Sequence, residues 1–270
     1  MSEARPAEVR RPIAPRVVLP VAAIVGLLLV GVAVRVASSP SASKAVAAIP
    51  AAEPPRRAPS ADRAHPPAPA TDVTTVAEAT VAAVRVFDRP STTRRPRAII
   101  TRQSPDTPLI FVVRARRRSW LSVYLPVRPN GSTGWIRRAG VHLTQHRYRI
   151  VVDLHAHRIT VLRGAAVIDR EPIGVGTSAT PTPGGHYYTD ALFQPPDPRG
   201  FYGPYAYGLS GFSNVLPSFA GGPGIIGIHG TNDPAGLGRD VSHGCIRMSN
   251  AGITLLARTL PLGVPVDIRA

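Results

Sequence analysis

The chain has 270 residues and a formal net charge of +16, and arginine supplies nearly all of the positive charge because Lys44 is the only lysine. Its 30 prolines and 24 glycines favour strands, loops and a linker over a helical bundle. The single cysteine, Cys245, excludes an intramolecular disulfide and a four-cysteine zinc module, and a hydrophobic fraction of 44% excludes both full disorder and a multi-span membrane protein.

The N-terminus combines a basic tail, residues 1–16, with an uncharged apolar stretch, residues 17–34. As a helix this stretch measures about 27 Å, close to the roughly 30 Å core of a bilayer. The arginines before it place the tail in the cytoplasm by the positive-inside rule. We therefore predict a single-pass signal-anchor over residues 17–36, a location in the cell membrane, and the rest of the chain outside the cytoplasm. A cleaved signal peptide is the alternative, and it also predicts export.

Residues 37–78 form a segment of proline, alanine and serine with scattered charge. Such a composition lacks the apolar surface needed to offset the entropy of ordering a chain. We expect a disordered linker with polyproline II character between the membrane and the folded part of the chain.

Residues 79–146 show the pattern of a small β-barrel. Short apolar runs at 84–87, 109–113 and 120–125 predict strands, and turn residues at 129–132 precede the Gly134-Trp135 pair. The stretch ending in PNGSTGWIRR resembles bacterial SH3-like domains, and this resemblance implies an SH3-like β domain before the catalytic one.

The barrel region is also strongly basic. Between residues 94 and 149 arginine dominates, and Asp106 is the single acid. A surface of this kind attracts polyanions, which outside the cell are anionic wall polymers or lipid headgroups. Export argues against nucleic acid as a partner. The alternative is that these arginines form an ordinary solvated surface.

Residues 147–270 read as a second β-rich domain. Alternating apolar residues at 148–154 and 159–161 predict a meander, and residues 266–268 predict a last strand. The aromatic-rich segment 177–222 is long enough to form a loop that walls a binding site. One short helix follows Asn250, which suits its N-cap.

Residues 225–250 contain the candidate reactive side chains, because Cys245 occurs there together with His229 and His243. A cysteine attacks as its thiolate, and a neighbouring imidazole can take the thiol proton. His229 closes the apolar run 225–228, so we expect it at a strand end, with Gly230 starting a loop. The proline and glycines that follow allow the chain to fold back and place His229 beside Cys245.

The turn before Cys245 adds a second catalytic element. Gly244 can take a backbone conformation that is closed to other residues. The backbone amides of His243, Gly244 and Cys245 can then converge on one point, as an oxyanion hole for a tetrahedral intermediate requires. A thiolate, a base and backbone donors together indicate acyl transfer.

Two other interpretations of the same residues remain open. His229, His243 and Cys245 are a possible set of zinc ligands, although no fourth ligand stands out. Alternatively, Cys245 is a small buried hydrophobic residue without a chemical role.

His229, the spacing that follows it, and Ser242-His243-Gly244-Cys245-Ile246-Arg247 resemble the signature of the L,D-transpeptidase catalytic domain, the YkuD family. The TPTPGG stretch at residues 180–185 is similar to an upstream element of that family. The resemblance covers about residues 148–270 and implies a β-rich exported enzyme. It implies Cys245 as nucleophile and His229 as general base and acid. Ser242, His243 and Gly244 would shape the turn and oxyanion site, and Gly230 and Arg247 are candidate substrate-binding residues.

The implied reaction is peptidoglycan cross-linking without a metal or organic cofactor. Cys245 attacks the carbonyl of the third residue of a tetrapeptide stem and D-Ala leaves. The side-chain amine of another stem then resolves the acyl-enzyme and forms a 3–3 cross-link. The alternatives are an L,D-carboxypeptidase, in which water resolves the acyl-enzyme, and a wall-anchoring protein with a vestigial catalytic domain.

Overall fold

The computed structural model describes residues 73–270 except 103, 105–106 and 220. The expected basic tail, the signal-anchor and residues 37–72 of the expected linker lie outside these residues. Within the described part, no helix is both long and apolar enough to cross a bilayer. The described chain is mainly β with a single α-helix, which confirms the fold class at this level.

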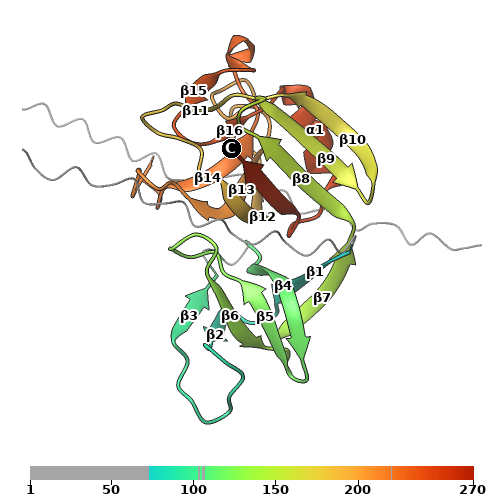
Figure 1. Cartoon of the computed structure of the whole chain (residues 1–270), viewed down its shortest axis with the longest axis vertical. Coiled ribbons are helices and arrows are strands. Elements are labelled where there is room, and N and C mark those ends of the chain that lie inside the picture. Colours follow the sequence, from blue (N-terminus) through green and yellow to red (C-terminus); the bar gives the residue numbers. More distant parts are fainter. Residues whose placement is uncertain (1–72, 103, 105–106, 220) are drawn as a thin grey trace, which may run out of the picture. The chain divides into compact units, whose positions relative to one another are not determined.

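The first part of the described chain is built from antiparallel strands. A five-stranded sheet has the order β6-β5-β4-β1-β7, and β2 and β3 form a separate pair (Figure 1). Fully buried Phe111, Val123 and Ile136 lie at the centre of its core. That this unit is SH3-like stays a prediction. The strands are β1 (Thr74–Ala79), β2 (Ala83–Val86), β3 (Ala98–Thr101), β4 (Ile110–Arg117), β5 (Trp120–Tyr124), β6 (Thr133–Arg137) and β7 (Val141–His146).

Strand β1 corrects the expected extent of the linker, which was placed over residues 37–78. The strand begins at Thr74 and pairs with both β4 and β7. Its Val76 and Ala77 are buried, one on each face of the sheet. This segment is a strand because both of its faces are buried. Its short and mostly polar sequence does not predict that burial.

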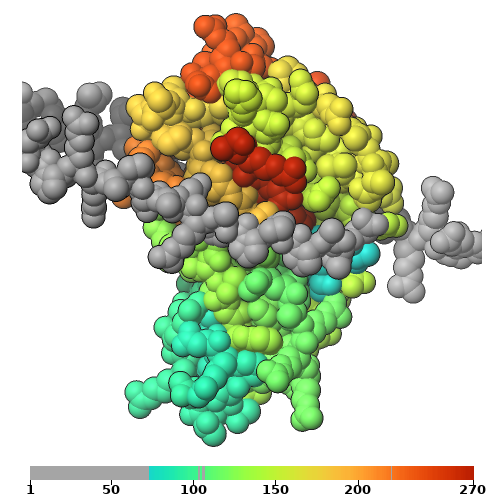
Figure 2. Space-filling model, viewed as in Figure 1, coloured from blue at the N-terminus to red at the C-terminus, as the bar shows by residue number. Residues whose placement is uncertain are grey.

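The second part forms an eight-stranded mixed sheet with the order β10-β9-β8-β17-β12-β13-β14-β16 (Figure 1). The last strand, β17, lies between β8 and β12, and its red residues are visible on the face shown in Figure 2. The chain therefore closes its own sheet with its C-terminal residues. The strands of this sheet are β8 (Tyr148–Asp153), β9 (Arg158–Arg163), β10 (Ala166–Pro172), β12 (Gly185–Phe193), β13 (Ala206–Phe212), β14 (Ile225–His229), β16 (Ile246–Arg247) and β17 (Pro265–Arg269).

The segment 177–222, part of which was expected to form a loop that walls a binding site, contains two strands. Strands β12 and β13 run through it as an antiparallel pair. Tyr187, Tyr188, Thr189 and Ala191 of β12 are buried, and the aromatic and glycine content of the segment does not predict this burial. The described residues of the segment outside the two strands are 177–184, 194–205, 213–219 and 221–222.

The expected helix is present as α1 (Asn250–Thr259), but its N-cap is Ser249 and not Asn250. The Ser249 hydroxyl accepts a hydrogen bond from the Gly252 amide at 2.9 Å and donates to the Glu171 carboxylate at 2.7 Å. The Asn250 side chain instead accepts from the Thr231 amide at 2.8 Å. Asn250 therefore fixes the start of the loop that follows His229.

The two sheets share a buried contact around Tyr188. This side chain is 1% exposed and packs with Val76, Ile110 and Val112 of the first sheet. Its hydroxyl donates to the Ile110 carbonyl at 3.0 Å. Burial raises the pKa of Tyr188 well above its usual value, so the phenol stays protonated as the donor.

We predict that Tyr188→Phe lowers the free energy of unfolding by about 1–2 kcal/mol, because the Ile110 carbonyl loses a buried donor without gaining water. Urea unfolding should show a lower midpoint with an unchanged slope. Tyr148→Phe, at a partly exposed ring, is the control. Equal midpoints for Tyr188→Phe and the wild type would contradict this account of the contact.

Candidate active site

Strands β14 and β16 position the candidate nucleophile and base. They run parallel, with Ile228 opposite Ile246 and His229 opposite Arg247. Successive side chains of a strand point to opposite faces, so the two buried isoleucines fix which face is the core. His229 and Arg247 then share the other face with Cys245, which stands two residues before Arg247. This register brings His229 and Cys245 to one side of the sheet edge.

His229 is held as a neutral imidazole with one nitrogen free. Its side chain is 1% exposed, and Nδ1 donates to the Gly230 carbonyl at 2.6 Å. A carbonyl only accepts, so the ring proton sits on Nδ1. Nε2 is buried and has no partner within the described residues. Burial lowers the pKa of His229 to about 4; the bond to Gly230 opposes this effect and the charge of Arg247 adds to it.

Cys245 is a free, partly exposed cysteine between β15 (Asp240–Ser242) and β16. Burial raises the pKa of its thiol. A hydrogen bond from the Gly227 amide and the positive charge of Arg247 act in the opposite direction but are smaller. Because burial lowers the pKa of His229 and raises that of Cys245, the resting groups are a neutral thiol and a neutral imidazole.

Ser242 locks the turn that carries Cys245. Its hydroxyl donates to the Cys245 carbonyl at 2.6 Å and accepts from the Gly244 amide at 3.1 Å. Gly244 has φ +112, a conformation that side chains other than glycine rarely adopt. The Gly244 amide is therefore engaged within the turn. Of the three amides expected at the oxyanion site, those of His243 and Cys245 have no partner among the described residues.

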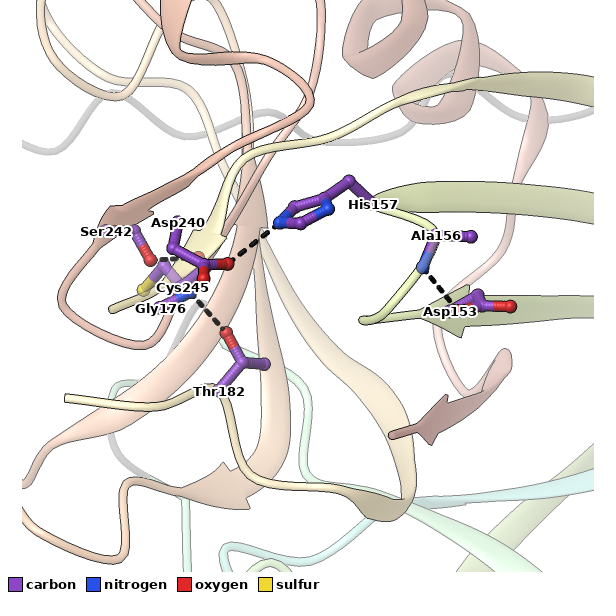
Figure 3. Close-up of polar contacts among 8 residues, drawn as sticks. All are labelled: Asp153, Ala156, His157, Gly176, Thr182, Asp240, Ser242 and Cys245. Atoms are coloured by element: carbon purple, nitrogen blue, oxygen red, sulfur yellow. Dashed lines mark hydrogen bonds and ion pairs between the residues drawn. The ribbon is translucent and has the colours of Figure 1, made fainter. Parts of the chain in front are cut away.

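The TPTP stretch supports this turn from the other side. The Thr180 hydroxyl and the Thr177 amide both donate to the Ser242 carbonyl, at 3.2 Å and 3.1 Å. The Thr182 hydroxyl accepts from the Gly176 amide at 2.8 Å (Figure 3). Gly176 ends the short strand β11 (Val175–Gly176), which pairs in parallel with β15. The resembling element at 180–185 thus acts as a brace for the cysteine turn.

A second brace reaches β15 from the turn between β8 and β9. His157 Nε2 lies 2.8 Å from Asp240 Oδ1 (Figure 3). His157 has φ +47, which is uncommon for a residue other than glycine. In the same turn, Asp153 accepts from the Ala156 amide at 2.8 Å.

A small cavity of about 20 Å³ is lined by both His229 and Cys245. Its wall is mostly apolar, and Phe219 stacks on His243 with ring centres 5.6 Å apart. On the other side of the base, Tyr202 meets the His229 ring edge-on at 4.9 Å. The lining residues are Phe201, Ser213, Leu216, Phe219, Gly224, Ile225, Ile226, His229, Ser242, His243 and Cys245.

Arg247 is a buried cation at the base of the site. Its side chain is 7% exposed, and its guanidinium lies 4.6 Å from the centre of the Phe201 ring. Its Nε has no hydrogen-bond partner, and no carboxylate of the described residues pairs with it. Within the described residues the charge of Arg247 is therefore not paired with a carboxylate.

Gly230, the other candidate for substrate binding, is buried behind His229. A Cβ at this position would meet Asn250 Oδ1 at 2.3 Å and Pro204 Cδ at 3.0 Å. Its carbonyl holds the His229 proton. In this geometry Gly230 orients the base and lies behind the cavity wall.

The part of the chain that the structure describes contains no cluster of side chains that would serve as zinc ligands. No group of three or more His, Cys, Asp or Glu side chains there is arranged to hold a metal ion. His229 Nδ1 is occupied by Gly230, and the His243 ring stacks on Phe219.

Comparison with known proteins agrees with the chemistry of this site. Residues 147–268 match the family model of the L,D-transpeptidase catalytic domain, the YkuD family. The resemblance read from the sequence is thereby confirmed. The L,D-transpeptidase YkuD of Bacillus subtilis (strain 168) is 36% identical over 121 residues, which are 45% of this chain and 65% of that protein. Its Bacillus licheniformis counterpart is 35% identical over the same shares. The match thus spans just under two thirds of these relatives.

Solved L,D-transpeptidase structures show more distant similarity. One from Mycobacterium smegmatis is 19% identical, with a TM-score of 0.39, and the match covers 60% of this chain and 90% of that one. Another from Mycobacterium tuberculosis is 17% identical, with a TM-score of 0.38, over 53% of this chain and 75% of that one.

Several residues of the L,D-transpeptidase-like site were not singled out by the sequence. Phe201 and Tyr202 cover His229, yet in the sequence they are two of many aromatic residues in a long segment. Burial and the nearby Cys245 raise the pKa of Tyr202. His157 and Asp240 carry no motif that would connect them. Each of these contacts depends on the folding of distant segments against one another.

The buried neutral His229 predicts a pH dependence of stability. The unfolded chain protonates this residue near pH 6.5, whereas the folded chain does so only near pH 4. The stability that depends on a neutral His229 is fully present above pH 6.5 and is lost as the pH falls towards 4. Between pH 7 and pH 4 the wild type should lose about 3 kcal/mol more free energy of unfolding than His229→Gln. Urea titrations at each pH measure this, and parallel profiles for the two proteins would contradict it.

Proposed function

We propose that the protein is a peptidoglycan L,D-transpeptidase that acts through a Cys245 acyl-enzyme. The observation that carries this proposal is the free, unprotonated Nε2 of His229 in the same cavity as the Cys245 thiol. A neutral imidazole with its proton fixed on Nδ1 can only accept a proton at Nε2. The family match supports the same reaction class.

In the first step His229 Nε2 takes the thiol proton while the sulfur attacks the carbonyl of the third stem residue. The amides of His243 and Cys245 would stabilise the oxyanion of the tetrahedral intermediate. The imidazolium then gives its proton to the departing nitrogen. The carbon–nitrogen bond breaks, D-Ala leaves as the amino acid, and a thioester remains on Cys245.

In the second step the side-chain amine of another stem attacks the thioester. His229 takes a proton from that amine, the carbon–sulfur bond breaks, and the thiol is restored. The product is a 3–3 cross-link. Water in place of the amine gives an L,D-carboxypeptidase, which is the second candidate. The mostly apolar wall around Cys245 favours transfer, because it limits the access of water to the thioester.

Arg247 supplies a binding role within this proposal. A buried guanidinium without an ion pair is a strong site for a carboxylate, and stem peptides carry carboxylates next to the scissile bond. Binding of that carboxylate would offset the effect of Arg247 on the His229 pKa. The base would then become stronger when the substrate is present.

We also propose that residues 17–36 anchor the protein in the cell membrane, with the β units outside the cytoplasm. The supports are the uncharged stretch, the arginines before it, and a proposed substrate in the wall. Exposed arginines on the β4–β5 hairpin, including Arg116, Arg117 and Arg118, fit anionic wall polymers as an additional partner.

A topology experiment tests the anchor. Alkaline phosphatase fused after Thr71 should be active, because its activity requires export. The same fusion without residues 17–36 should be inactive and remain in the cytoplasm. An active fusion recovered in the soluble fraction would replace the anchor with a cleaved signal peptide.

The catalytic pair is tested by two variants of the ectodomain on a purified tetrapeptide stem. Cys245→Ala should release no D-Ala and form no acyl-enzyme detectable by intact-protein mass. His229→Ala should release D-Ala about 10²–10⁴-fold more slowly, because it keeps the thiol but loses proton transfer. His155→Ala removes an exposed histidine away from the cavity and should behave as the wild type.

Analysis of the muropeptides separates the two reactions. A 3–3 cross-linked dimer identifies a transpeptidase, whereas a tripeptide alone identifies a carboxypeptidase. Full activity of Cys245→Ala in the presence of a chelator would overturn the acyl-enzyme mechanism. If Cys245→Ala is fully active without a chelator and inactive with one, the result would support the zinc interpretation.

A further inference from the structure

One wall of the Cys245 cavity comes from the connection between β13 and β14. This cleft-wall segment, residues 213–219 and 221–224, contributes Ser213, Leu216, Phe219 and Gly224 to the cavity lining. Its two ends are joined by a hydrogen bond from the Ser213 amide to the Gly224 carbonyl at 2.8 Å. The Ser213 hydroxyl also accepts from the Leu216 amide at 3.0 Å. The segment is thus a loop that its own hydrogen bonds close.

The support for this loop comes from the first β unit. Arg128, in the connection between β5 and β6, donates to three carbonyls of the cleft-wall segment. They are those of Ser213 at 2.8 Å, Pro223 at 3.2 Å and Leu216 at 3.3 Å. The guanidinium also lies 4.8 Å from the centre of the Phe212 ring. No carboxylate of the described residues pairs with Arg128, so its donors are directed at the loop.

Asn130 holds the start of the same loop. Its side-chain amide donates to the Phe212 carbonyl at 2.8 Å, and its side-chain oxygen accepts from the Phe212 amide at 2.9 Å. This two-way pairing copies the bonding of a neighbouring strand at the last residue of β13. Together Asn130 and Arg128 fix where the chain leaves the sheet and how the loop then folds.

The unit that supplies these residues is firmly seated on the catalytic sheet. Tyr188 is buried among residues of β1 and β4, and His146 Nε2 lies 3.2 Å from the Gly263 carbonyl. Arg128 and Asn130 are therefore held at a fixed place beside the cavity. A tethered, independent module would not provide such fixed donors.

We propose that Arg128 and Asn130 are positioning residues for substrate binding. They hold the cleft-wall segment so that Leu216 and Phe219 form the wall against which the donor stem peptide lies. In this view the first β unit is part of the substrate-binding machinery of the catalytic domain. The inference rests on the proposed function for its substrate, but the positioning itself does not depend on any reaction.

The kinetic test compares Arg128→Ala and Asn130→Asp with the wild type in D-Ala release. Asn130→Asp keeps the shape and the acceptor but loses the donor to the Phe212 carbonyl. Both variants should raise KM for the tetrapeptide about tenfold and change kcat by less than about twofold, because they remove binding and leave the catalytic pair intact. Alkylation of Cys245 by iodoacetamide should stay within about twofold of the wild-type rate in both.

The matched control is Arg258→Ala, which removes the same charge from an exposed position in the last turn of α1. Its KM should equal that of the wild type. A similar rise of KM in Arg258→Ala would overturn the proposal in favour of general electrostatic attraction. An unchanged KM in both Arg128→Ala and Asn130→Asp would overturn it as well.

Hydrogen exchange gives a readout that needs no activity. In Arg128→Ala the amides of Val215 and Leu216, which bond to Ser213, should exchange at least about tenfold faster, while the Ile228 amide in β14 should not change. Unchanged exchange at Val215 and Leu216 would overturn the positioning role. If the wild type releases no D-Ala but the exchange result holds, the proposed function fails and the positioning of the wall stands.

Discussion

The parallel pairing of β14 with β16 is the constraint on which the site depends. Two buried isoleucines, Ile228 and Ile246, face each other across this pair and set its register. A slip of one residue would turn His229 into the core and expose an isoleucine, so the hydrophobic core itself enforces the arrangement. The braces from residues 177–182 and from His157 act on the preceding strand, β15, and so fix the turn from which Cys245 projects.

Burial determines the protonation states that this arrangement produces. The same low-dielectric surroundings that lower the pKa of His229 raise that of Cys245, so the resting pair carries no charge. Arg247 is the permanent charge nearby, and it favours the thiolate while it disfavours the imidazolium. A site of this kind holds a neutral thiol and a neutral imidazole before a substrate binds.

The first β unit is joined to this chemistry by specific contacts. Tyr188 fills the boundary between the two sheets, and Arg128 and Asn130 reach from one unit to the loop that walls the cavity of the other. The strongly basic composition of the first β unit predicts a long-range attraction of polyanions. The structure adds a short-range contact for one of those arginines, Arg128, which donates to backbone carbonyls of the loop that walls the cavity.

The sequence by itself predicted the candidate reacting groups, the β-rich class, the short helix and the resemblance to the L,D-transpeptidase catalytic domain, because these depend on residue types and local spacing. The SHGC turn, the apolar run before His229 and the helical period after Asn250 are all local signals. Only the tertiary structure decided the start of β1 inside the expected linker, Ser249 as the helix cap, the engagement of the Gly244 amide, and the places of Tyr202 and Arg128. Each of these depends on which distant segments pack together and on hydrogen bonds between them, and no local pattern in the chain encodes those distances.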